Sequence, residues 1–242
     1  MHTTYFNWSS GKDSSLALYK LLQDSEYKIS KLVTTVNSDY NRVSMHGLRI
    51  ELLEKQVASL GFPLEKITFP AEVSMETYSN TMREATTQLY NEGNTHGVFG
   101  DIFLEDLRIY RDEQLAQVGI KGVYPLWKKD TKALLKEFID VGFKAITVCV
   151  NAKYLSEDFC GRIIDASFIE DLPDTVDPCG ENGEFHTFVY DGPIFKKPIP
   201  FTIGEKVLRR YDKTDDEDTC FVEEDDQKSW DTAFWYCDLI SN

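Results

Sequence analysis

The chain has 242 residues, 42% of them hydrophobic and 13% aromatic, which is enough for one large or two small domains with a sizeable core. Its formal net charge of −15 and the lack of a basic stripe argue against a nucleic-acid partner. No apolar run approaches the roughly 18 residues of a membrane span. The residues before the first polar loop do not resemble a leader, so we expect a cytoplasmic protein with no membrane partner.

Strand and helix patterns alternate through the first half of the chain. Tyr5, Phe6 and Trp8 predict the end of a short buried strand, and an apolar helix follows over 16–22. Further strands are predicted over 29–36, 64–69, 97–99 and 121–124, and further helices over 48–60, 73–91 and 104–118. This alternation favours a parallel sheet covered on both faces, with ligands beyond the carboxyl ends of the strands. We place the end of this domain, 1–127, at Pro125-Leu126-Trp127.

Residues 128–242 are predicted to form a smaller α+β domain. A helix is expected over 131–141, strands over 144–150 and 185–190, and a terminal strand within 230–240. Two segments, 163–195 and 212–226, together carry a net charge of −16, so the rest of the chain is near neutral. We interpret the second segment as a solvated loop. The first contains a motif with candidate site residues.

A run of small polar residues follows the first strand: Ser9-Ser10-Gly11-Lys12-Asp13-Ser14-Ser15. A turn of this kind leaves backbone N–H groups unpaired at a helix N-terminus, where the helix dipole also favours an anion. The serine hydroxyls add donors and Lys12 adds a positive charge. The spacing is neither that of a Walker loop nor that of the dinucleotide fingerprint. The segment therefore predicts a phosphate site of another kind, and a polar turn without a ligand is the alternative.

The second motif, residues 177–195, has the sequence DPCGENGEFHTFVYDGPIF. Gly180 and Gly183 allow tight turns close to a ligand. Glu181, Glu184 and His186 fall within six residues. Two carboxylates and an imidazole at this spacing can hold Mg²⁺, an amine or ammonia, or transfer protons. A solvated acidic turn before a strand is the alternative, but the glycines and the accompanying loop favour a functional site.

The two motifs together resemble one known family. The loop resembles the S-G-G-x-D-S loop of the PP-loop ATP pyrophosphatases, with Ser10 where that group usually has glycine. Residues 177–195 resemble the G-E-x-G-E-F/Y-H-T … D-G-P-x-F signature of the diphthine–ammonia ligase family. Weaker matches are Asn37, Met45-His46-Gly47, Gly100-Asp101-Ile102, Arg108 and Pro125-Leu126-Trp127. The resemblance implies an α/β fold: a parallel-sheet, HUP-like PP-loop nucleotide-binding domain and a smaller α+β C-terminal domain.

The resemblance also implies a nucleotide site. Its phosphate-binding residues would be Ser9, Ser10, Gly11, Lys12, Asp13, Ser14 and Ser15, acting on ATP together with Mg²⁺. Asp13 is expected to cap the helix or to bind metal, because a bare carboxylate repels phosphate. Asn37 and His46 would border the adenosine, and Gly100 and Asp101 would line the cleft.

Four further residues carry the implied chemistry. Arg108 either counters charge at the α-phosphate or is a surface helix residue like Arg111. Glu181, Glu184 and His186 would hold the acceptor or ammonia, and one of them would take a proton from the attacking amine.

The implied reaction joins ammonia to a carboxylate in two steps. The carboxylate attacks the α-phosphorus of ATP and releases pyrophosphate, and ammonia then displaces AMP from the acyl-adenylate. No glutaminase segment is present, so ammonia would come from solution or from a partner. The acceptor is a protein side chain or a small metabolite, and a homodimer is left open. A regulatory protein that binds ATP or AMP without turnover is the alternative from another class.

The five cysteines do not form a C-x-x-C pair, so we expect free thiols rather than a zinc ribbon or a redox pair. Cys179 lies within the second motif. It is interpreted as a packed residue, with a nucleophile as the weaker hypothesis.

Overall fold

The computed structural model describes residues 1–44, 47–211 and 232–242. His46, the acidic segment 212–226 and Cys220 lie outside the described residues.

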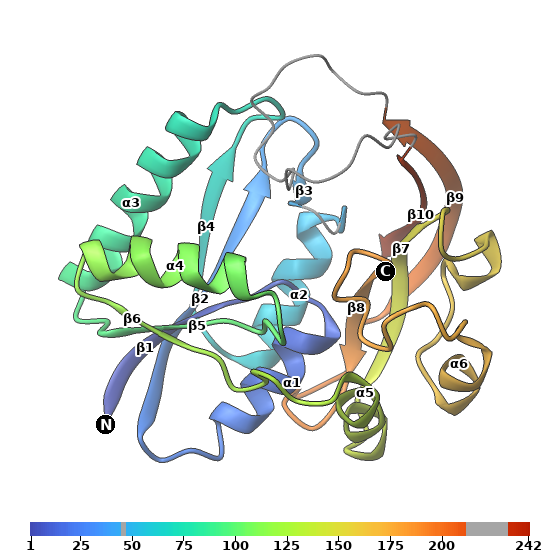
Figure 1. Ribbon diagram of the computed structural model, residues 1–242, viewed down its shortest axis with the longest axis horizontal. Helices are drawn as coiled ribbons and strands as arrows, with labels where there is room; N and C mark the ends of the chain where they lie inside the picture. Colours follow the sequence, from blue (N-terminus) through green and yellow to red (C-terminus); the bar gives the residue numbers. More distant parts are fainter. Residues whose placement is uncertain (45–46, 212–231) are drawn as a thin grey trace.

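The first half of the chain builds a mainly parallel sheet (Figure 1). Five parallel strands have the spatial order β4-β2-β1-β5-β6, and a short strand, β3, pairs antiparallel with the end of β2. Their bounds are His2–Asn7 (β1), Tyr27–Asn37 (β2), Arg42–Val43 (β3), Leu64–Phe69 (β4), His96–Val98 (β5) and Lys121–Val123 (β6). The predicted parallel α/β sheet is therefore confirmed, and β3 was not predicted.

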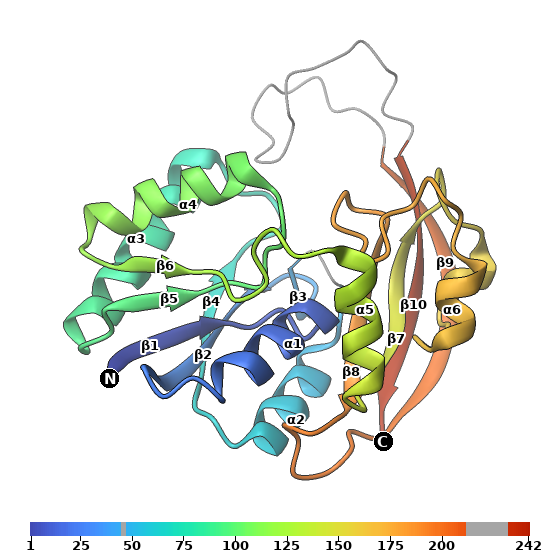
Figure 2. The ribbon, with the colours of Figure 1, turned by 60° about the horizontal axis from the view of Figure 1, so that its bottom comes forward.

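Two helices cover each face of this sheet (Figure 2). The helices are Lys12–Leu21 (α1) and Ile50–Leu60 (α2) on one face, and Met75–Asn91 (α3) and Glu105–Gln117 (α4) on the other. Alternation along β1 explains this arrangement, because neighbouring strand residues point to opposite faces. Phe6 belongs to the core under α1 and α2, whereas Tyr5 belongs to the core under α3 and α4.

The second half of the chain builds an antiparallel sheet with the order β8-β7-β10-β9. The strands are Lys144–Asn151 (β7), Phe185–Asp191 (β8), Phe201–Tyr211 (β9) and Thr232–Ser241 (β10), and the helices are Thr131–Asp140 (α5), Glu157–Phe159 (η1, a 3₁₀ turn) and Ala166–Asp171 (α6). The prediction missed β9 and α6. Most described side chains of β9 are exposed, so its sequence has no clear apolar face, and its pairing with β10 defines it.

Strand β8 joins the second sheet to the first half of the chain. The amide of Val189 donates to the carbonyl of Ser10 over 3.0 Å. The buried amide of Gln56, on α2, donates to the carbonyls of both residues over 3.1 and 2.6 Å. One hydrophobic core runs through both halves and includes Leu126, at the predicted boundary. The division into 1–127 and 128–242 stays a prediction.

Candidate functional site

The polar loop connects β1 to α1 and closes on itself through its serines. Gly11 is the N-cap of α1, with extended backbone angles. The hydroxyls of Ser14 and Ser15 both donate to its carbonyl, over 3.0 and 2.9 Å. Ser9 Oγ donates to Ser14 Oγ over 3.0 Å. These contacts shape the loop around the first turn of α1, whose leading N–H groups have no intrahelical acceptors.

Ser10 is the strained residue of this loop. Its φ of 74° lies in the left-handed region that favours glycine. Its side chain is fully buried, and its Oγ has no hydrogen-bond partner among the described residues. A buried hydroxyl without a partner is costly, so Ser10 combines backbone strain with an unsatisfied donor, and its predicted role in phosphate binding stays a prediction.

The side chain of Lys12 does not project into solvent. Its side chain is buried, and its ammonium donates to both Asp13 oxygens over 2.8 and 3.0 Å and to the carbonyl of Cys179. The ammonium also lies 5.2 Å from the centre of the Phe185 ring. Burial alone would lower the pKa of Lys12, but the Asp13 carboxylate more than compensates, and the pKa is raised. Asp13 pairs with Lys12, and α1 has no side-chain cap, so the expected capping role is not seen.

The adenosine residues predicted from sequence are only partly described. Asn37 ends β2, and its Oδ1 accepts from the amides of Asp39 and Tyr40 over 3.0 and 3.1 Å. The side chain therefore closes the turn that follows the strand. His46 lies outside the described residues, so its expected place beside Asn37 stays a prediction.

The segment after β5 packs against the start of α1. A Cβ at Gly100 would lie 3.0 Å from the Ser14 amide nitrogen, which explains why glycine suits this position. Asp101 forms an ion pair with Arg111, whose guanidinium lies 4.7 Å from the centre of the Phe99 ring. Arg111 is thus a partly exposed helix residue that has both a charged and an aromatic partner.

Arg108 occupies a different position on α4. Its guanidinium lies 4.6 and 4.5 Å from the ring centres of Tyr124 and Trp127, and its Nε donates to Asp112 over 3.4 Å. The structure thus pairs Asp101 with Arg111 and places Arg108 between aromatic rings. A role for Arg108 at the α-phosphate stays a prediction.

The turn of the second motif is organised by two carboxylates. Glu184 is 2% exposed, and it accepts from the amides of Asp177 and Asn182 and from the side chain of Asn182, over 2.9–3.1 Å. Asp177 accepts from the amides of Cys179 and Glu181 over 2.9 and 3.2 Å. With its oxygens occupied in this way, Glu184 holds the shape of the turn.

Of the two carboxylates and the imidazole predicted to act in the motif, Glu181 and His186 have shifted pKa values. Burial, reinforced by the Asp13 charge, raises the pKa of Glu181 to about 7. Glu181 Oε2 also accepts from the Ile102 amide over 3.3 Å. Burial and the Lys12 charge lower the pKa of the half-buried His186 to about 4. Near pH 7 the imidazole is therefore neutral, and Glu181 exchanges a proton readily.

Three segments far apart in the sequence thus meet at one place. Lys12 and Asp13 come from the loop, Ile102 from the segment after β5, and Glu181 from the second motif. Thr187, which sequence reasoning did not single out, adds a contact, because its hydroxyl accepts from the Lys12 amide over 3.0 Å. A sequence signal for another missed residue existed: Gln56 is a polar residue on the apolar face of the predicted helix 48–60.

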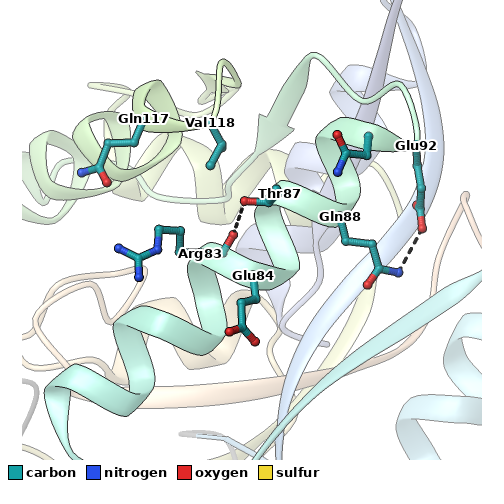
Figure 3. Close-up of a pocket in the computed structure, with 8 residues that line it drawn as sticks. Arg83, Glu84, Thr87, Gln88, Glu92, Gln117 and Val118 are labelled. Atoms are coloured by element: carbon teal, nitrogen blue, oxygen red, sulfur yellow. Dashed lines mark hydrogen bonds between the residues drawn. The ribbon is translucent and has the colours of Figure 1, made fainter.

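Two hollows lie under or beside α3 and α4. One is an open groove of about 760 Å³, and in Figure 3 its side chains pair locally, with Thr87 bonded to the Arg83 carbonyl and Gln88 to Glu92. The other is a cavity of about 280 Å³ between these helices and the sheet, mostly apolar in lining, with Asn7 and Arg111 among its polar residues. Asn7 precedes the loop by two residues, so this cavity is the one adjacent to the site.

Two further observations concern the whole described chain. Across residues 1–44, 47–211 and 232–242, no group of three or more His, Cys, Asp or Glu side chains is arranged to hold a metal ion. Within the same ranges, no helix is long and apolar enough to cross a membrane. The four described cysteines, Cys149, Cys160, Cys179 and Cys237, are buried free thiols, as predicted.

The fold and the site together define an α/β protein with a phosphate-type loop facing an acidic turn from a second sheet. Two family models match the chain, one over each half. The diphthamide synthase N-terminal domain matches residues 2–122, and the diphthamide synthase C-terminal domain matches residues 130–238. The chain belongs to the diphthamide synthase family, as the sequence motifs predicted.

Three curated relatives of the chain are named diphthine–ammonia ligase. A diphthine–ammonia ligase of Danio rerio is 31% identical over 64% of this chain and 66% of its own length. The enzyme of Schizosaccharomyces pombe is 30% identical over 54% of this chain, but the match spans only 24% of that longer protein. The enzyme of Rattus norvegicus is 24% identical over 84% of each chain.

Proposed function

We propose that this protein is an ATP-dependent carbon–nitrogen ligase that forms AMP and pyrophosphate and joins ammonia to the carboxylate of diphthine. One observation carries the proposal: the phosphate-type loop and the Glu181 turn lie against each other, joined through Lys12. A ligase that activates a carboxylate with ATP needs a phosphate-binding site next to a general base that accepts the proton of the attacking amine. The family and the names of its curated relatives agree with this chemistry.

The loop fits a polyphosphate on two independent grounds. The leading amides of α1 have no intrahelical acceptors, although that of Lys12 already donates to Thr187, and the buried Ser10 hydroxyl has no partner among the described residues. Ser9, Gly11, Ser14 and Ser15 shape the loop, and Asn37, His46, Gly100 and Asp101 border the adenosine and the cleft. Mg²⁺ would be held through the ATP phosphates, where it neutralises their charge.

The acceptor carboxylate attacks the α-phosphorus, and pyrophosphate leaves with the electrons of the broken P–O bond. Ammonia then attacks the carbonyl of the acyl-adenylate, and AMP leaves. We assign Glu181 to take the proton that nitrogen loses in this step, because its pKa of about 7 lets it accept and release a proton at neutral pH. His186, neutral at the same pH, faces the same substrates, while Glu184 holds the turn.

Phosphorus NMR of the protein with ATP, Mg²⁺ and ammonium tests the proposal. Elongation factor 2 bearing diphthine is added as the protein acceptor, and a small-molecule cell extract is the matched alternative. AMP and pyrophosphate that appear only with the protein acceptor support the proposal. Stimulation by the extract alone would favour a metabolite acceptor, and ATP that binds without cleavage would favour a regulatory protein. A Gly11→Val variant, which blocks the loop, should release no AMP.

A further inference from the structure

The ammonium of Lys12 has a complete set of partners inside the protein. An ammonium group has three N–H donors. Here they face the two Asp13 oxygens and the Cys179 carbonyl. The side chain is 4% exposed. A buried ammonium is tolerated only when it is paired and hydrogen-bonded, so this arrangement leaves Lys12 no donor for a phosphate oxygen.

The contacts of Lys12 instead connect the loop to the second motif. Its backbone amide donates to Thr187 on β8, and its ammonium lies over the Phe185 ring of the same strand. Cys179, whose carbonyl accepts from the ammonium, lies two residues before Glu181. One side chain thus bridges the start of α1, the acidic turn and β8.

We propose that Lys12 is a positioning residue for Glu181, and that it does not ligate phosphate. It holds the turn that carries Glu181 against the loop, and its positive charge favours the ionised carboxylate that accepts the proton. The inference rests on the proposed function only for the use that the enzyme makes of Glu181.

The surroundings of Glu181 explain why one cation matters. From α1 it is faced by Asp13 and Lys12, and from the segment after β5 by Asp101 and by the Ile102 amide. Burial and the two aspartates disfavour the ionised form of Glu181, while Lys12 and the amide favour it. Without the Lys12 charge, the carboxylates of Asp13 and Asp101 near Glu181 are no longer offset by a cation, and they repel its ionised form. The midpoint of Glu181 ionisation should then rise by about one pH unit, as expected for the loss of an adjacent opposite charge.

The experiment compares Lys12→Met with wild type in two measurements. Carbon NMR of side-chain-labelled glutamate follows the Glu181 carboxyl through a pH titration, with Glu181→Gln to assign the signal. Calorimetry measures the affinity for α,β-methylene-ATP with Mg²⁺, a nucleotide that cannot be cleaved at the relevant bond. We expect the midpoint to rise and the affinity to stay within about threefold of wild type, because no phosphate contact is lost.

Lys20→Met is the matched control, because Lys20 lies on the same helix and pairs with Glu137. It should change neither measurement. If the Met variant does not fold, Lys12→Gln replaces it, since the amide can still donate to Cys179 without the charge. A tenfold or greater loss of affinity, the size expected for a lost charge-assisted phosphate bond, overturns the inference, and so does an unmoved midpoint. If wild type does not bind the analogue at all, the proposed function fails, while the titration still tests the positioning role.

Discussion

Ser10→Gly should stabilise the protein, although it removes a fully buried side chain. The left-handed backbone at φ 74° costs a non-glycine residue about 1–2 kcal/mol. The buried hydroxyl without a partner among the described residues adds a cost of about 1–3 kcal/mol. Against this, glycine loses about 0.5–1 kcal/mol more on folding, and the deleted methylene forfeits about 0.8 kcal/mol of burial. The net expectation is a gain of about 2 kcal/mol, or roughly 4–8 °C in Tm for a chain of this size.

Urea and thermal unfolding without nucleotide measure this gain. Lys128→Gly is the control, because Lys128 also has a positive φ, of 54°, but its side chain is exposed. This variant should be stabilised by the relief of backbone strain alone, because no buried unpaired hydroxyl is removed with it. Ser10→Ala, which keeps the backbone strain and removes the hydroxyl, separates the two contributions. A Ser10→Gly protein less stable than wild type would refute the reasoning. With ATP present the advantage of the variant should shrink, since the wild-type hydroxyl then gains a phosphate partner.

Three further changes test other parts of the site. Glu181→Gln should increase the free energy of unfolding relative to wild type, and by more at pH 8 than at pH 5. The folded-state pKa of Glu181 is raised to about 7, so the wild-type protein is less stable once the pH has risen through 7 and the buried carboxyl has ionised, whereas glutamine stays neutral. Urea unfolding at the two pH values measures this, and an equal effect at both would contradict the raised pKa. Glu184→Gln should lower the free energy of unfolding by about 1–3 kcal/mol, because its carboxylate accepts three hydrogen bonds in the turn. It should leave the Kd for ATP near wild type, and calorimetry that showed weakened ATP binding with unchanged stability would oppose the positioning role. Arg111→Met should reduce the rate of AMP formation at least tenfold if Asp101 lines the nucleotide site as proposed, because it leaves that carboxylate without its cation. Arg108→Met, on the same helix, is the control. If both variants lose the same fraction of the rate of AMP formation, the ion pair between Arg111 and Asp101 is not specifically required.

Much of the architecture could be predicted from local patterns. The apolar runs located every parallel strand of the first sheet and missed only its short antiparallel strand, β3, and the small-residue run after β1 located the loop. These features depend on neighbours in the sequence, which is why periodicity and turn chemistry reveal them. The missed β9 shows the limit, since its described side chains are largely exposed and only its partner β10 makes it a strand.

The residues of the site were found from sequence more readily than their roles. The sequence motif predicted the same role for Glu181, Glu184 and His186, which was to hold the acceptor or ammonia and to transfer a proton. Only the tertiary structure distinguishes them, because it surrounds Glu184 with amide donors and buries Glu181 beside Asp13. Likewise, two arginines one helical turn apart had the same appearance in the sequence, and the fold alone placed Arg111 against Asp101.

What the sequence by itself determined is therefore most of the helices and strands, the loop and the chemical content of the second motif. What only the tertiary structure decided is which of these groups meet. Lys12 contacts Cys179 and Thr187 across more than 160 residues of chain. Such a contact leaves no local pattern, because the spacing of apolar residues records that a side chain is buried and does not record its partner. The charge state of Glu181 and the orientation of Lys12 follow from those partners, so they are properties of the folded chain.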